Sequence, residues 1–126
     1  KVQFLFLLIS VVKKNSVIKI KGRKDRFRDL VYIDDVVNAF LHCLKKKRSI
    51  KNQIFNIGTG KKIFIHEIIN KIAKLYNKKV IIKQVDYTPG DIHGCYADPS
   101  KLKGTGFNFK FNFDRGLKIF KQWFDK

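Results

Sequence analysis

The residues best suited to chemistry are an arginine and several carboxylates in the run Gly-Arg-Lys-Asp-Arg-Phe-Arg-Asp-Leu-Val-Tyr-Ile-Asp-Asp. This run places Arg28 and Asp29 between a glycine-bearing turn and the alternating residues 30–33, which predict a strand. A guanidinium held there is suited to a phosphate, because its planar donors can bind two oxygens at once. From the residues alone, a surface ion pair of Arg28 with Asp29, Asp34 or Asp35 is the more common alternative.

A helix is expected directly after this run. Asp34 and Asp35 suit a helix N-terminus, where free N–H groups and the helix dipole favour acids. Apolar residues follow at helical spacing and give one apolar face: Val36, Val37, Phe40, Leu41 and Leu44. The basic cluster from Lys45 to Arg48 stands where this helix should end, and cations there complement the dipole.

Strands and helices alternate along the rest of the chain, which predicts the α/β class. Strands are expected at residues 17–20, 53–57 and 80–85. A helical apolar stripe covers residues 65–76, and Asn112 is a suitable N-cap for a last helix. The apolar side of that last helix is assigned to the core, and it comprises Phe113, Leu117, Phe120, Trp123 and Phe124.

The apolar run at residues 2–12 has two interpretations. Lysines flank it, as they flank the apolar region of a signal peptide, but no small-residue cleavage site follows. The run is also shorter than the roughly 20 residues that span a bilayer. We therefore expect a core helix, no membrane association and a cytoplasmic protein.

Several motifs, in order along the chain, resemble those of the sugar-nucleotide epimerases and dehydratases in the extended short-chain dehydrogenase/reductase family. The matching segments are Arg28-Asp29 to Asp34, Phe55 to Gly60, Thr88 to Asp91, Tyr96 to Leu102, Gly106-Phe107, and Gly116-Leu117 with Trp123. The resemblance implies the C-terminal part of an extended Rossmann-type epimerase fold, namely its last sheet elements and a small α/β substrate-binding lobe. Residues 1–126 would form this one segment.

The resemblance also implies roles for individual residues toward a nucleotide sugar, most simply a UDP-sugar. Arg28 would grip the diphosphate, and Asp91 would lie near the ribose, although Asp91 also fits ordinary turn chemistry. Thr88 stands where many epimerases have a second phosphate-binding arginine. His93 and Cys95 would lie at the lip of the pocket.

Two family motifs that serve catalysis do not occur in the sequence. There is no Gly-x-x-Gly-x-x-Gly run to bind a dinucleotide, and no tyrosine is followed four residues later by lysine. In the family both belong to the N-terminal part, with the cofactor NAD. We therefore expect a C-terminal piece of a longer enzyme that is inactive and does not bind NAD alone. Epimerase and dehydratase chemistry, and a homodimer of the full-length protein, stay open.

The net charge of +18 raises one alternative, a small basic module that binds RNA or DNA. The excess is almost entirely lysine and is spread along the chain, which favours a solvated basic surface. Two cysteines predict no disulfide framework. The His42-Cys43 and His93-Gly94-Cys95 pairs lack the spacing of a structural zinc site, so no metal is expected.

Overall fold

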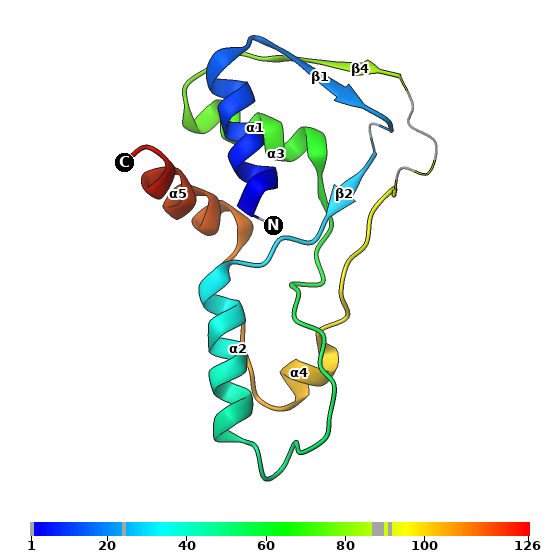
Figure 1. Cartoon of the computed structure of the whole chain (residues 1–126), viewed down its shortest axis with the longest axis vertical. Coiled ribbons are helices and arrows are strands. Elements are labelled where there is room, and N and C mark those ends of the chain that lie inside the picture. Colours follow the sequence, from blue (N-terminus) through cyan, green and yellow to red (C-terminus); the bar gives the residue numbers. More distant parts are fainter. Residues whose placement is uncertain (1, 24, 87–89, 91) are drawn as a thin grey trace.

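The computed structural model describes residues 2–23, 25–86, 90 and 92–126, and the side chains from residue 4 onward within them. The elements are α1 (Val2–Lys14), β1 (Val17–Lys21), β2 (Phe27–Arg28), α2 (Ile33–Lys45), β3 (Ile63–Phe64), α3 (Ile65–Leu75), β4 (Ile81–Val85), α4 (Ser100–Gly104) and α5 (Phe113–Phe124). Helices α1, α3 and α5 lie with β1 and β4 at one end of the molecule, and α2 lies with α4 at the other (Figure 1). Long extended segments connect the two ends.

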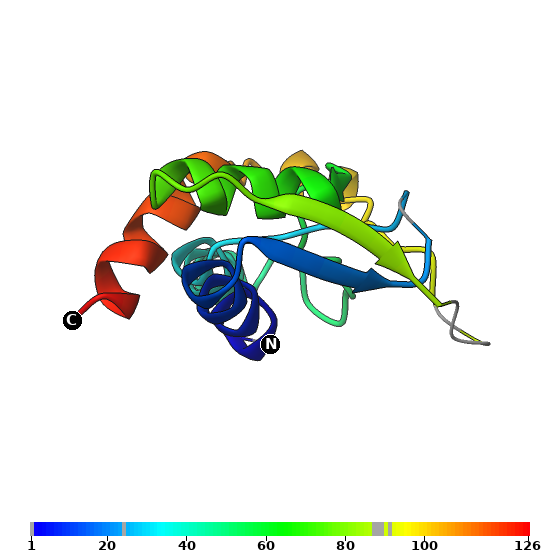
Figure 2. The ribbon, with the colours of Figure 1, turned by 90° about the horizontal axis from the view of Figure 1, so that it is seen from above.

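Two small sheets organise the strands. Strands β1 and β4 pair in parallel, with Val17 opposite Ile81 and Lys21 opposite Val85, and Figure 2 shows them running in the same direction. The other sheet is the antiparallel pair of β2 and β3, in which Arg28 lies opposite Ile63. The α/β class is confirmed, as are the strands expected near residues 17–20 and 80–85.

The main core lies between α1, β1, α3 and α5. The apolar run at the N-terminus forms α1 and buries Ile9 and Val12 completely, which confirms a core helix. Strand β1 alternates and turns Ile18 and Ile20 inward. Helix α3 contributes the largest buried stripe, Ile65, Ile68, Ile69, Ile72 and Ala73, and Leu117 of α5 completes the cluster. Within the described residues, no helix has both the length and the apolar character needed to cross a bilayer.

The helix starts follow from their local sequences. Asn112 caps α5, because its side-chain oxygen accepts a hydrogen bond of 2.9 Å from the Arg115 N–H. Helix α3 begins after Phe64, which has no side-chain oxygen to offer. Instead, the Glu67 carboxylate accepts from the Phe64 N–H at 3.0 Å and satisfies one free donor at this end.

A second, smaller cluster holds α2 to the far end of the molecule. Its buried members are Ala39 of α2, Leu102 of α4 and Phe107. Phe55 and Ile57 pack against this cluster from the extended segment that follows α2. Asp35 is completely buried at the start of α2, and its carboxylate accepts from the backbone N–H groups of residues 110 and 111 at 2.9 and 3.0 Å.

Two predicted strands are wrong. Residues 53–57 have extended backbone but form no strand, and neither do residues 30–32, which lead into α2. A strand needs a neighbouring backbone that accepts and donates hydrogen bonds. Among the described residues, these segments have no such neighbour, and side-chain packing against the small cluster holds Phe55 and Ile57 instead.

Two predicted apolar surfaces differ from expectation. The face predicted for α2 is exposed at Val37, Phe40, Leu41 and Leu44, because the helix packs inward through Ala39 instead. Trp123, which the sequence pattern assigns to the core, is also exposed. The centroid of its ring lies 5.4 Å from that of the Phe120 ring. Helical spacing identifies an apolar face without identifying what covers it.

The C-terminal end of α5 is tied to the ends of α1 and α3 by one carboxylate. Asp125 accepts from the ammonium groups of Lys121 at 2.7 Å and Lys13 at 3.0 Å, and from the Tyr76 hydroxyl at 2.9 Å. These donors, led by Lys121, hold the pKa of Asp125 well below its usual range. Burial and the nearby carboxylate together raise the pKa of Tyr76.

We predict that Asp125→Asn lowers the free energy of unfolding at pH 7 and that the loss shrinks in acid. The folded state lowers the pKa of this carboxyl, so its contribution is present above the unfolded pKa of about 3.9 and is lost as the pH falls below it. Urea unfolding of both proteins at neutral pH and at several values below about pH 4 measures this difference. A difference that stays constant over that range would contradict the prediction.

Candidate functional site

Three segments that are far apart in the sequence meet at β2. We call them the three-segment junction: residues 27–29, 58–60 and 93–97. The Phe27 N–H donates to the carbonyl oxygen of His93 at 3.1 Å, and the Ala97 N–H donates to the Asp29 carboxylate at 3.2 Å. Figure 1 shows the chain after α2 and the chain before α4 passing this point on their way between the two ends.

Asp29 holds the junction together. One carboxylate oxygen accepts from the Thr59 N–H at 2.9 Å and from the Thr59 hydroxyl at 2.6 Å. The other accepts from the Gly60 N–H at 2.9 Å and from the Ala97 N–H. Four donors therefore converge on one half-buried carboxylate, and hydrogen bonds to a charged acceptor are stronger than neutral ones.

Glycines allow the segments to approach this closely. A Cβ atom on Gly58 would lie 2.5 Å from the Ala97 Cβ and 2.8 Å from an Asp29 carboxylate oxygen. A Cβ atom on Gly94 would lie 2.7 Å from the Phe27 carbonyl oxygen. Gly60 has φ +75°, a conformation that side-chain-bearing residues rarely adopt.

Arg28 is half-buried at the centre of the junction. Its Nη1 donates to the Phe27 carbonyl oxygen at 2.7 Å, which orients the guanidinium. Within the described residues it forms no ion pair with a carboxylate. Two of the three expected partners are bound elsewhere, because Asp29 accepts from the junction and Asp35 accepts from backbone N–H groups. Within the described residues, none of the remaining N–H groups of the Arg28 guanidinium therefore binds a carboxylate.

Further positive charge lies beside Arg28. The Lys62 ammonium lies over the rings of Phe27 and Tyr96, 4.9 and 4.6 Å from their centroids. His93, whose ring centroid lies 5.3 Å from that of Phe27, contacts Asp25, an exposed carboxylate that also binds Arg23 in a bidentate pair. The hydrogen bond from Arg23 lowers the pKa of Asp25 well below its usual range.

The other residues predicted for the site have different outcomes. Cys95 is exposed on the 93–97 segment, so the fold brings its segment beside Arg28. Thr88 and Asp91 lie outside the described residues. The Thr59 hydroxyl donates to Asp29 and accepts from the backbone N–H of Lys61 at 3.2 Å.

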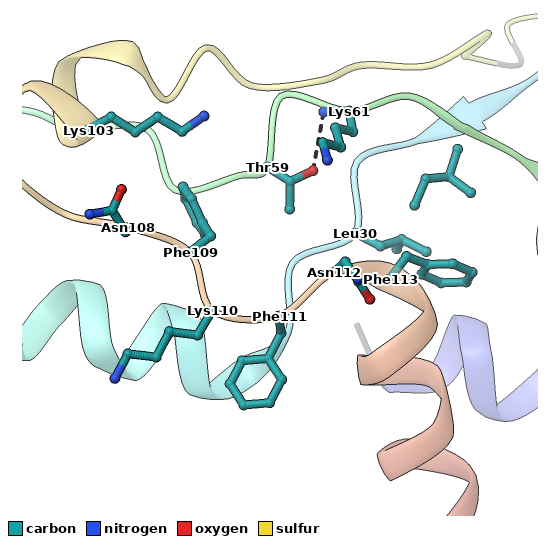
Figure 3. A pocket seen from close by; sticks show the side chains of 11 residues that line it. Leu30, Thr59, Lys61, Lys103, Asn108, Phe109, Lys110, Phe111, Asn112 and Phe113 are labelled. Atoms are coloured by element: carbon teal, nitrogen blue, oxygen red, sulfur yellow. Dashed lines mark hydrogen bonds between the residues drawn. The ribbon is translucent and has the colours of Figure 1, made fainter.

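A cavity of about 450 Å³ lies near the junction but is not lined by Arg28 or Cys95. Thr59 belongs to both the cavity and the junction. Lys103 reaches the cavity from α4 and Lys61 from the turn after Gly60 (Figure 3). The wall otherwise comes mostly from the run before α5, Asn108, Phe109, Lys110, Phe111 and Asn112, with Leu30, Ile63 and Phe113. The sequence analysis missed this cavity; its only signal is that alternation of aromatic and polar residues.

The chain matches known proteins in sequence. Residues 2–58 match the family model of the NAD-dependent epimerase/dehydratase family. An uncharacterised protein of Methanocaldococcus jannaschii is 39% identical over 98 residues, which are 77% of this chain and 29% of that protein. The UDP-glucose 4-epimerase of Bos taurus is 30% identical over 98 residues, 76% of this chain and 28% of the epimerase.

The chain belongs to the NAD-dependent epimerase/dehydratase family.

Solved structures of epimerases have the same fold as this family member. The UDP-glucuronic acid 4-epimerase of Bacillus cereus, in complex with UDP-glucuronic acid and NAD, superposes with a TM-score of 0.80 at 24% identity. The match covers 94% of this chain and 38% of the epimerase. The chain therefore spans less than half the length of the relatives it matches, and it has the fold of part of a Rossmann-type epimerase.

The turn at residues 58–60 of this epimerase/dehydratase family member does not fit the pyrophosphate of NAD. A dinucleotide-binding turn needs glycines that leave room for the phosphates and N–H groups that point at them. In the turn at 58–60, the space beside Gly58 is filled by Asp29 and Ala97, and the N–H groups of residues 59 and 60 donate to Asp29. This turn is occupied by the protein's own carboxylate.

We predict that Asp29→Asn destabilises the folded chain by about 2 kcal/mol or more. The amide replaces one acceptor oxygen with an NH₂ group, which then faces backbone donors that have lost their partner. The free energy of unfolding, measured by urea titration, should fall far more than in Asp34→Asn. Asp34 is exposed at the start of α2, and its removal weakens only a helix-dipole interaction of less than about 1 kcal/mol. Equal losses in the two variants would contradict this prediction.

Proposed function

We propose that this chain is the nucleotide-sugar-binding portion of an NAD-dependent epimerase or dehydratase, and that Arg28 binds the diphosphate of a UDP-sugar. The observation that carries the proposal is the state of the Arg28 guanidinium. It is half-buried, oriented by the Phe27 carbonyl oxygen, and free of a carboxylate partner among the described residues. A partly desolvated cation gains more from pairing with an anionic ligand than a fully exposed one does.

The junction supports this role by fixing the backbone on both sides of Arg28. Asp29 binds the 58–60 and 93–97 segments, so the strand that bears Arg28 cannot shift without breaking four hydrogen bonds. Lys62 adds positive charge without forming a fork that could replace the guanidinium. A pre-organised donor group of this kind binds a diphosphate at little further entropic cost.

The names of the relatives support a nucleoside diphosphate sugar as the ligand class. The Bos taurus relative is a UDP-glucose 4-epimerase, and the Bacillus cereus structure contains UDP-glucuronic acid. Both ligands combine two phosphates with a sugar, and Arg28 is suited to the phosphates. We therefore take a UDP-sugar as the first ligand to test. Cys95, exposed on the neighbouring segment, is a described residue that we place at the lip of the nucleotide-sugar pocket.

We predict that Arg28→Ala weakens UDP-glucose binding about 10- to 100-fold. Charge-assisted hydrogen bonds contribute roughly 1.5–3 kcal/mol, which corresponds to that range of affinity. Arg28→Lys keeps the charge but loses the planar fork, so binding should be intermediate. The affinity of the 126-residue chain can be measured by NMR titration of its backbone amides, with free glucose as the ligand that lacks phosphate.

Arg48→Ala is the matched control, because it removes an exposed arginine just beyond α2 and should leave UDP-glucose affinity unchanged. A mixed-sequence oligonucleotide tests the alternative of a basic nucleic-acid module. If overall charge governs binding, Arg28→Ala and Arg48→Ala should weaken oligonucleotide binding equally and depend strongly on salt. UDP-glucose affinity that is the same in Arg28→Ala as in the unaltered chain would overturn the proposal.

We also predict that the 126-residue chain alone neither binds NAD tightly nor interconverts UDP-sugars. Hydride transfer requires the cofactor to be held against the substrate, and the glycine turn at 58–60 is filled by Asp29. Fluorescence titration with NADH and a coupled assay for UDP-galactose formation from UDP-glucose measure the two properties. Robust turnover by the purified chain would show that this account of the turn is wrong.

A further inference from the structure

The cavity near the three-segment junction is positively charged at one end. Lys61 follows the 58–60 turn and Lys103 belongs to α4, and in Figure 3 both side chains reach toward the space beside Thr59. Within the described residues, no acidic side chain lines this cavity. Two ammonium groups from separate elements therefore face one space that contains no carboxylate of the described chain.

Neither of these two lysines forms an ion pair with an acid of the part of the chain that the structure describes. Both side chains are exposed, and the Lys103 ammonium lies 5.9 Å from the centroid of the Phe109 ring, which also lines the cavity. Hydrogen bonds from Ser100 and, less strongly, the charge of Lys103 lower the pKa of Asp98, but Asp98 and Lys103 are not in contact. The two ammonium groups are therefore available to an anion from solution.

The other end of the cavity is apolar. Leu30 and Phe113 lie on the opposite side of the view from Lys103 (Figure 3), and Ile63 of β3 also lines the wall. These three apolar side chains pack against the main core, which holds the wall in place. Ligand sites combine an apolar wall with a few polar groups and have volumes of roughly 300–1,000 Å³. At about 450 Å³, this cavity has the size and the lining of such a site.

From this lining we propose that the cavity binds a small organic phosphate, namely a phosphate monoester with an apolar ester group. The phosphate lies between Lys61 and Lys103, because two ammonium groups match a dianion and lysine binds phosphate as a point charge. The ester group lies against Leu30, Ile63 and Phe113 and buries apolar surface there. A carboxylate carries only one negative charge and matches the two lysines less well.

This site is separate from the one proposed at Arg28, which does not line the cavity. Thr59 belongs to both places, but its hydroxyl donates its one proton to Asp29 and accepts from the Lys61 N–H. Thr59 therefore has no donor left to offer a ligand in the cavity. The inference does not depend on the role of Arg28, and the two sites can be tested independently in the same chain.

The test uses 1-naphthyl phosphate as the probe and measures its affinity for the 126-residue chain by NMR titration of the backbone amides at physiological salt. Methyl phosphate keeps the dianion without the rings, and 1-naphthol keeps the rings without the dianion. Both should bind at least about tenfold more weakly than 1-naphthyl phosphate, because each loses its contacts at one end of the cavity. The shifted amides should include those of residues 59–63 and 108–113. Equal affinities for methyl phosphate and 1-naphthyl phosphate, or shifts confined to other segments, would overturn the inference.

Substitutions of single lysines test the charged end. Lys61→Gln and Lys103→Gln should each weaken 1-naphthyl phosphate binding about three- to tenfold, because each removes one of the two charges. Lys101→Gln is the matched control. It removes the same charge from the same helix, but the Lys101 ammonium lies over the Phe55 ring and does not line the cavity. An equal loss of affinity in all three variants would show attraction by overall charge and would overturn the inference.

Arg28→Ala separates the two sites. It should leave the affinity for 1-naphthyl phosphate unchanged, and Lys103→Gln should leave the affinity for UDP-glucose unchanged. Loss of 1-naphthyl phosphate binding in Arg28→Ala would show that Arg28 holds the phosphate, and the separate site would be ruled out. An unchanged UDP-glucose affinity in Arg28→Ala, together with the expected lysine effects on the probe, would count against the proposed function alone.

Discussion

The arrangement of the whole site depends on one carboxylate. Asp29 accepts four hydrogen bonds from residues that lie 30, 31 and 68 positions away along the chain. These bonds set the path of the chain after α2 and of the chain before α4, and thereby the distance between the two ends of the molecule. Arg28 is positioned as a consequence, because it precedes Asp29, which is hydrogen-bonded to the other two segments of the junction. A hydrogen-bonded carboxylate, rather than apolar packing, defines the centre of this site.

The protein uses its few acids mainly for backbone donors and for joining elements. It has 10 acidic residues against 28 lysines and arginines, so nearly every carboxylate has a choice of cations. Asp29 and Asp35 nevertheless bind N–H groups of distant loops, and Asp125 joins the ends of three helices. Two lysines that pair with no acid among the described residues, Lys62 and Lys101, lie over aromatic rings. The positive charge is thus spread over the surface, while the acids determine the geometry.

Local patterns in the sequence predicted α1, α2, α3, α5, the strands near residues 17–20 and 80–85, and the Asn112 cap, because each depends on residues close together in the chain. Arg28 was found in the same way, from its place between a turn and an alternating run. The role of Asp29 could not be read locally, since its donors arrive from residues 59, 60 and 97. The exposure of Trp123 and of the apolar residues of α2 was not predicted for the same reason. Apolar residues at helical spacing show that a helix has an apolar face, but they do not show which element covers it.

The parallel pair of β1 and β4 has a consequence for how the chain folds. Val17 meets Ile81, so the ladder forms only after the whole stretch containing α2, β3 and α3 has been brought together. Pairings between residues so distant in sequence form slowly, because a long loop must be closed before any contact stabilises it. Until then β1 and β4 present bare edges in a chain that also bears an apolar helix surface. Newly made copies are therefore exposed to aggregation for longer than a helical chain of this length. The net charge of +18 opposes aggregation, because two such chains repel each other.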